Sequence, residues 1–271
     1  MRLDNRLLLI LLLAFVYLYG WTILHWDFDF SKLVAIFSFG LLTQTLFCLA
    51  FKIPVNAAIS TIITTMLLGL MIRTEFIFIC GMVSFFAVSS KYIFQYNGKH
   101  LFNPANFGLI FMILFTHQAF ITTHQTDFIV ISGIVLGIIG ILYRSDAKKI
   151  DMLVFYFALN LLVGFVYKFL GYSFESFQLN DVWFLIYSFI LVADPLSSPN
   201  SRIGRLIWAL AIVLITHVLG CNLNLPYAHF YALAIGGFVM VLIDYVFNKE
   251  ARFSWDSVHR RALYTNDLML T

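Results

Sequence analysis

Runs of apolar residues separated by short polar stretches make up most of the chain. A helix that crosses the hydrocarbon core of a bilayer needs roughly 20 apolar residues, and most of the runs approach that length. They cover residues 7–24, 33–51, 55–72, 76–94, 104–121, 127–143, 152–170, 182–193, 206–220 and 227–247. The pattern predicts an all-α polytopic membrane protein with about ten transmembrane helices. The shortest run stops at Asp194-Pro195, so we expect that helix to be cut short.

The composition agrees with this interpretation. Hydrophobic residues make up 61% of the chain and charged residues 11%, with a mean hydropathy of +0.90. Soluble domains carry roughly 25% charged residues, so lipid must replace water over most of this surface. No linker rich in Pro, Gly or Ser divides the chain, and residues 1–247 are predicted to form a single transmembrane domain. Residues 248–271 are expected to form a cytoplasmic tail that lies at the membrane interface or, alternatively, is disordered.

The basic residues predict the orientation. All but three of the 17 Lys and Arg residues lie at the N-terminus, in the C-terminal tail or in alternate loops. Loops that carry Lys and Arg stay on the cytoplasmic side of a membrane. Both termini are therefore predicted to be cytoplasmic, which requires an even number of helices. The three exceptions are Lys32, Arg73 and Lys168.

The polar loop at residues 89–108 is more elaborate than a simple reversal of direction requires. Asn97-Gly98 is a turn signal, and Asn103-Pro104 predicts a helix start, with an N-capping Asn followed by Pro at the first helical position. A tight turn followed by a capped helix explains these four residues. It leaves unexplained a second group of polar residues in an apolar setting: Lys91, Lys99, His100 and Asn106.

A second elaborate loop covers residues 193–205. Two dipeptides in close succession predict helix starts: Asp194-Pro195 and Ser198-Pro199. Such a pattern is typical of broken or re-entrant backbone, which membrane proteins tolerate where protein or a wet cavity surrounds it. An isolated carboxylate costs about 2.5–3.5 kcal/mol at the bilayer centre, so Asp194 is expected to pair with Arg202 or Arg205. A functional and an architectural role both remain open for the candidate residues of this loop: Asp194, Pro195, Ser198, Pro199, Arg202, Gly204 and Arg205.

A few ionisable residues lie outside the two loops. Asp244 falls in the last run, about one turn from its cytoplasmic end, and is expected to pair with a basic group of the Arg202/Arg205 loop or to reach the interface. His217 lies inside an apolar run and is the best single candidate for a haem ligand among the histidines. No histidines near the non-cytoplasmic ends are spaced as a local ligand pair, so no metal site is predicted. The three cysteines are too scattered for a disulfide framework.

The two loops resemble the paired signatures of one family. The segments K-H-L-F-N-P-A-N-F (99–107) and A-D-P-L-S-S-P-N-S-R-I-G-R (193–205) are similar to those of the RnfD/NqrB family, the membrane subunits of the Rnf and sodium-translocating NADH:quinone oxidoreductase complexes. Residues 137–150 and 226–244 agree in order, and the resemblance covers roughly residues 80–247. It implies a urea-transporter-like fold of two five-helix inverted repeats, in the bacterial inner membrane.

One feature of that family is missing. Its members carry flavin mononucleotide (FMN) covalently on the threonine of an S-G-A-T-like motif between the two loops. None of the threonines between residues 107 and 143 follows Ser-Gly-Ala; they are Thr116, Thr122, Thr123 and Thr126. The chain therefore resembles a short form of the family on which covalent FMN is not expected. A non-covalently bound flavin or a quinone stays open as a cofactor.

The resemblance implies an integral membrane subunit that supports electron transport or coupled ion transport with partner membrane or redox subunits. The alternatives are a small-solute channel or carrier of the same fold without a redox role, and a scaffold subunit of a larger membrane assembly. No P-loop, GxGxxG, zinc motif or Ser/His/Asp array points to an enzymatic reaction. A nucleic-acid partner is not expected.

Overall fold

The computed structural model describes residues 5–53, 57–122, 127, 131, 134–135, 150–171, 186–194 and 196–247. Most of these residues are helical. The α-helices are α1 (Asn5–Thr22), α2 (Phe30–Phe51), α3 (Ala58–Met71), α4 (Ile77–Ile93), α5 (Pro104–Thr116), α7 (Ile150–Phe169), α9 (Arg202–His217) and α10 (Ala228–Phe247). Two five-residue π-helices are η2 (Tyr187–Leu191) and η3 (Val218–Asn222). By length and composition, α1, α2, α7, α9 with η3, and α10 could each cross a membrane, whereas α3, α4 and α5 are shorter apolar helices.

The all-α part of the prediction is confirmed. Eight of the apolar runs coincide with α-helices within a few residues. The run at 127–143 lies almost entirely outside the described residues, as does the tail at 248–271. Of the run at 182–193 the structure describes residues 186–193, where η2 ends three residues before Asp194. That helix ends ahead of the Asp-Pro pair, as the sequence predicts.

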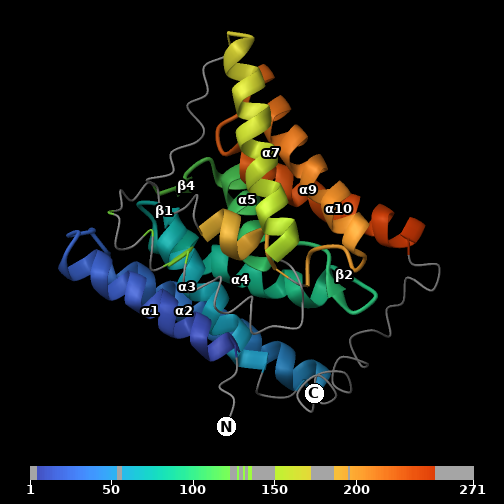
Figure 1. Ribbon diagram of the computed structural model, residues 1–271. Helices are drawn as coiled ribbons and strands as arrows, with labels where there is room; N and C mark the ends of the chain where they lie inside the picture. The colour runs from blue at the N-terminus through green and yellow to red at the C-terminus, as the bar shows by residue number, and fades with distance from the viewer. Residues whose placement is uncertain are drawn as a thin grey trace.

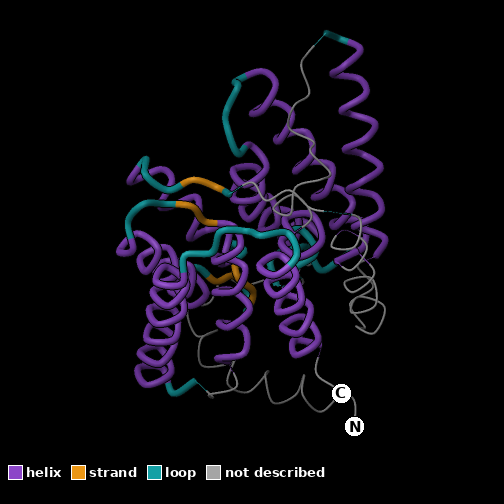
Figure 2. The backbone as a smooth tube through the Cα atoms, turned by 90° about the vertical axis from the view of Figure 1, so that its left-hand side faces the viewer, coloured by secondary structure: helices purple, strands orange, loops and turns teal. Residues whose placement is uncertain are grey.

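The helices form two groups, which Figure 1 and Figure 2 show from two sides. In the first, α4 packs mainly against α2 and α5, while α3 joins α1 and α2. In the second, α9 packs mainly against α7 and α10. The groups meet where α5 packs against α10.

Two short strand pairs lie at opposite ends of α4. Strand β1 (Ile72–Arg73) precedes α4 and pairs antiparallel with β4 (Phe120–Ile121), so the chain segments that follow α3 and α5 lie together. Strand β2 (Gln95–Tyr96) follows α4 and pairs with β3 (Lys99–His100) in a hairpin. Figure 2 shows the two pairs, in orange, at separate levels of the molecule. The loops before and after α4 therefore lie at opposite ends of that helix.

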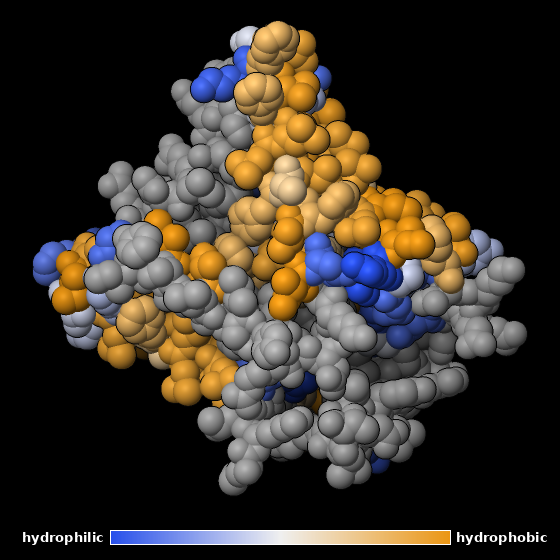
Figure 3. Space-filling model, viewed as in Figure 1, coloured by the Kyte–Doolittle hydropathy of each residue, from blue (hydrophilic) through white to orange (hydrophobic). Residues whose placement is uncertain are grey.

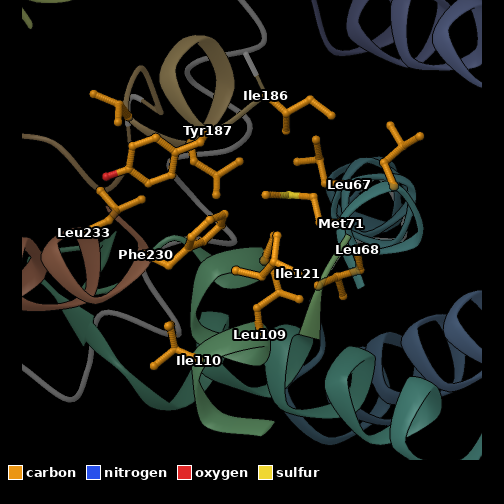
Figure 4. Close-up of a cluster of buried hydrophobic side chains, with 14 of the residues drawn as sticks. Leu67, Leu68, Met71, Leu109, Ile110, Ile121, Ile186, Tyr187, Phe230 and Leu233 are labelled. Carbon is orange, nitrogen blue, oxygen red and sulfur yellow. The ribbon is translucent and has the colours of Figure 1, made fainter. Parts of the chain in front are cut away.

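An apolar cluster fills the junction of the two groups (Figure 4). Its side chains come from α3, β4, α5, η2 and α10, and Tyr187 packs against Phe230 with ring centroids 5.2 Å apart. The outer faces of the helices are also apolar: Phe30 is 77% exposed and Phe169 85%. Figure 3 shows apolar atoms covering α7 and its neighbours, interrupted by a hydrophilic patch below the lower end of α7. Such continuous exposed apolar surface is suited to lipid and costly in water.

The chain before α5 approaches the middle of α10. A Cβ atom added at Gly237 would lie 2.2 Å from the carbonyl oxygen of Leu101, and Gly237 is the tenth of the 20 residues of α10. Non-helical backbone therefore packs halfway along a helix of membrane-spanning length. Only glycine allows so close an approach of two backbones.

Candidate functional site

The β2–β3 hairpin turns the chain back into the molecule after α4. Its two central residues, Asn97 and Gly98, have φ values of 47° and 75°. Positive φ at both positions is characteristic of the type I′ turn, in which Asn-Gly is the favoured pair. The predicted turn is confirmed, and it brings Lys99 and His100 into buried positions.

Lys99 lies at the centre of a buried polar assembly. Its Nζ donates to Asp244 Oδ2 at 2.9 Å and to the carbonyl oxygen of Ser198 at 2.6 Å. Asp244 Oδ1 accepts the backbone N–H of Asn200 at 3.0 Å. One ion pair thus connects the hairpin, the 193–205 loop and α10. Burial lowers the pKa of Lys99, and the attraction of Asp244 opposes this shift.

The sequence predicted a different partner for Asp244. A basic group of the Arg202/Arg205 loop, or exposure at the interface, was expected, and both predictions are wrong: Lys99 binds Asp244, whose side chain is 3% exposed. The 193–205 loop contributes a backbone N–H and a backbone carbonyl to the pair. The hairpin carries the ammonium group to Asp244 from a residue 145 positions earlier in the chain.

Asp194 is held by neutral donors. Its Oδ2 accepts from Asn103 Nδ2 at 3.1 Å and from Ser197 Oγ at 3.2 Å. Its Oδ1 accepts the backbone N–H of Leu196 at 3.0 Å. The hydroxyl of Ser198 donates to the Asp194 carbonyl at 3.0 Å, which closes the turn. The carboxylate therefore both shapes the loop and anchors it to the start of α5.

The expected pairing of Asp194 with Arg202 or Arg205 is also wrong. Both arginines face Asp151 in the first turn of α7: Arg202 Nε lies 2.8 Å from Asp151 Oδ2, and Arg205 Nη2 lies 4.0 Å from it. Because α9 packs against α7, its first turn faces Asp151. Arg205 Nη1 also donates to the Asn200 carbonyl at 2.8 Å. The sequence analysis missed Asp151, although an acidic residue in the first turn of a helix is a recognisable signal.

The start of α5 matches its prediction. Asn103 caps the helix by accepting the N–H of Asn106 at 3.3 Å, with Pro104 at the first helical position. The side chain of Asn106 is fully buried, and its Nδ2 donates to the Phe230 carbonyl of α10 at 3.0 Å. Asn103 and Asn106 thus connect α5 to the 193–205 loop on one side and to α10 on the other.

The start of α9 differs from its prediction. The helix begins at Arg202, and Ser201 caps it by accepting the N–H of Gly204 at 3.0 Å. Ser198-Pro199 lies in irregular backbone instead of starting a helix. The N–H of Asn200 donates to Asp244 of α10 instead. A Cβ at Gly204 would lie 2.5 Å from Ser201 Oγ and 2.7 Å from Ile243 Cγ2 of α10, so the small residue favours close packing of α9 here.

Lys91 lies outside the Lys99 assembly and binds a different set of polar groups. Its Nζ donates to the carbonyl and hydroxyl oxygens of Ser60, at 3.2 and 3.3 Å, and to Thr61 Oγ1 at 3.3 Å. Thr61 in turn donates to Gln44 Oε1 at 2.6 Å. Lys91 therefore joins α2, α3 and α4 inside the first group of helices. The structure brings the other predicted site residues into or beside the assembly, except Pro195, which lies outside the described residues.

In the part of the chain that the structure describes, no three His, Cys, Asp or Glu side chains are grouped to hold a metal ion. The assembly instead contains fixed charges and capped helix starts, joined by hydrogen bonds between the two groups of helices. No protein-family model and no curated protein sequence matches the chain.

Replacing Asp194 with alanine is expected to lower the yield of folded protein. The change leaves the buried donors of Asn103 and Ser197 without their acceptor, at about 1–3 kcal/mol for each, whereas the exposed N–H of Leu196 can bind water. Size-exclusion chromatography in detergent measures the yield. Arg202→Ala is the contrasting variant. The Arg202 side chain is 75% exposed, so its removal should lower the stability of the fold by less than about 1 kcal/mol. Equal losses in both variants would contradict this assignment.

Proposed function

We propose that the chain is an integral membrane subunit of the RnfD/NqrB type, which supports electron transport or coupled ion transport together with partner proteins. One observation carries this proposal. The two segments that resemble the family signatures meet in a single buried assembly, where Lys99 binds Asp244 and the Ser198 carbonyl while Asn103 binds Asp194. Buried charges in a helical membrane protein are costly, and they are retained mainly where ions or coupling require them.

We also propose a ten-helix arrangement of two inverted five-helix repeats. The packing pattern supports it: α4 packs against α2 and α5, and α9 packs against α7 and α10. These helices would be the fourth, second and fifth of each repeat. Helices α5 and α10, equivalent under this relation, contact each other between the groups. An odd number of helices per repeat inverts the second repeat relative to the first.

The proposed location is the bacterial inner membrane, with both termini in the cytoplasm. The hairpin, the 193–205 loop and the start of α7 lie together through Lys99, Asp194 and Asp151. These segments belong to the basic set of loops. The paired strands β1 and β4 belong to the other set and lie at the opposite end of α4.

Cysteine labelling in intact cells tests the orientation. In a chain whose three cysteines are replaced by serine, Asn222→Cys is expected to react with a membrane-impermeant maleimide. Asn200→Cys is the matched control, since its side chain is exposed at the other end of α9 and should react only after the cells are opened. The reverse order of reactivity would reject the proposed orientation.

Isolation of the tagged chain from its native membranes in mild detergent tests the function. We expect proteins with flavin or iron–sulfur absorbance to copurify with it, and no flavin fluorescence at 31.1 kDa after denaturing electrophoresis. The second expectation follows from the missing acceptor motif. A colourless chain recovered without partners would favour the small-solute channel, and colourless partners would favour the scaffold.

A further inference from the structure

A second set of buried polar side chains lies in the second group of helices, apart from the Lys99 assembly. Four of its members have a side-chain oxygen without a hydrogen-bond partner in the structure described: Tyr156 and Asn160 of α7, Ser188 of η2 and Thr216 of α9. All four side chains are at least 97% buried. Orphaned buried polar atoms are uncommon, because each loses its hydrogen bonds to water without replacement.

Three of these groups lie close together. The Tyr156 hydroxyl lies beside the side chains of Asn160, Ser188 and Tyr187, although its contacts with them do not meet the geometry of a hydrogen bond. Asn160 Nδ2 donates to the Tyr156 carbonyl at 2.9 Å, and the Tyr187 hydroxyl donates to the His229 carbonyl at 2.7 Å. Figure 4 shows the Tyr187 hydroxyl pointing away from the apolar cluster. Buried polar groups that lie close together without well-formed hydrogen bonds between them commonly bind water.

The polar groups extend along the interface of α7 and α9. At one end, Asp151 of α7 lies 4.0 Å from Arg205 of α9. At the other end, the rings of Tyr167 and His217 have centroids 5.3 Å apart. The two helices therefore run side by side in the same direction. Asp151 and Tyr167 are separated by about 24 Å at 1.5 Å per residue, which is most of the roughly 30 Å hydrocarbon core.

The α7 members of the set share one face. Tyr156, Asn160 and Tyr167 follow a spacing of four and then seven residues, which places them in one row along the helix. Thr216 adjoins His217 in α9, opposite the end of that row. Polar side chains thus occur at both ends of the interface and between them.

Both π-helices adjoin this set. Tyr187 and Ser188 are the first two residues of η2, and η3 begins directly after His217. A π-helical turn costs hydrogen-bond geometry and is found mostly at functional sites. The π-helices therefore mark the same set of polar residues independently of the orphaned oxygens.

We propose that Tyr156, Asn160, Ser188 and Thr216, together with Tyr187, bind a chain of water molecules that conducts protons through the second group of helices. In each step the Tyr156 oxygen accepts a proton from the water on one side and releases its own proton to the water on the other. One proton moves along the chain, no side chain stays charged, and the transmembrane gradient drives the transfer without an oxidant or reductant. This inference rests on the proposed membrane function and names the proton as the ion that the subunit handles.

Proton uptake into liposomes tests the proposal. The purified chain is reconstituted in phosphatidylethanolamine and phosphatidylglycerol vesicles with a trapped pH-sensitive dye, and a potassium gradient with valinomycin sets an inside-negative potential. The wild-type protein should acidify the lumen, and Tyr156→Phe and Ser188→Ala should each lower the initial rate at least tenfold. Ser84→Ala is the matched control: Ser84 is a fully buried hydroxyl of α4 that also lacks a partner, and its removal should leave the rate unchanged.

Thermal unfolding of the same variants supplies a readout that is independent of transport. A hydroxyl bound to water stabilises the fold, so Tyr156→Phe should lower the Tm, whereas removing an unsatisfied hydroxyl would raise it. The proposal is overturned by a raised Tm, by wild-type uptake no faster than in protein-free vesicles, or by an unchanged rate in Tyr156→Phe. If these results occur while redox partners still copurify, only the proton path fails. Proton uptake by a chain that recruits no partners would instead contradict the proposed subunit function.

Discussion

Replacing Lys99 with methionine is expected to remove most of the folded protein. The variant leaves the Asp244 carboxylate, which is 3% exposed, without its cation. Breaking a buried pair in this way costs about 3–5 kcal/mol, a large part of the stability of a typical protein. The monodisperse fraction in detergent and its Tm both report the loss.

The double variant Lys99→Met with Asp244→Leu separates charge from packing. Replacing both members of a buried pair with apolar side chains is often close to neutral, so the double variant should fold better than either single variant. The surface pair Lys32–Asp29, at 3.2 Å, is the control, and Lys32→Met should change the stability by less than about 1 kcal/mol. A stable Lys99→Met protein would mean that the pair has no structural role.

The second large effect is expected at Gly237. Gly237→Ala puts a methyl group 2.2 Å from the Leu101 carbonyl oxygen, so α10 and the chain before α5 must separate. Overpacking typically costs about 1–3 kcal/mol, and a backbone atom cannot rotate away as a side chain can. We therefore expect a loss at or above that range, measured as Tm and as the yield of monodisperse protein.

Gly236 supplies a matched control on the same helix. A Cβ at Gly236 would also lie 2.2 Å from its nearest neighbour, but that neighbour is the terminal Cδ1 of Ile212. A flexible side-chain end moves at small cost. Gly236→Ala should therefore be clearly milder than Gly237→Ala, and equal losses would show that the approach to Leu101 is not specific.

Local sequence signals were sufficient where short-range chemistry decides the structure. The apolar runs located the helices, and Asn97-Gly98 and Asn103-Pro104 gave the hairpin turn and the start of α5. The meeting of the two loops was also predictable, because each contains polar groups that an apolar setting leaves unsatisfied alone.

Long-range partners were not predictable from the same signals. Lys91 and Lys99 are eight residues apart and chemically alike, yet Lys91 lies within α4 and binds α3 while the hairpin directs Lys99 toward α10. Charge alone offered Asp194 and Asp244 several possible partners. The row formed by Tyr156 and Asn160 is hidden in the sequence, since single polar residues barely change the hydropathy of an apolar run.

The Lys99–Asp244 pair also bears on how the protein is made. A ribosome adds about 5–20 residues per second, so Asp244 emerges roughly 7–30 s after Lys99, given their separation of 145 residues. During that interval the first five helices must hold an ammonium group whose carboxylate has not been synthesised. We expect nascent chains that stop before α10 to stay incompletely inserted at the hairpin and open to membrane proteases. Formation of the Lys99–Asp244 pair would then distinguish chains that have reached α10 from shorter nascent chains.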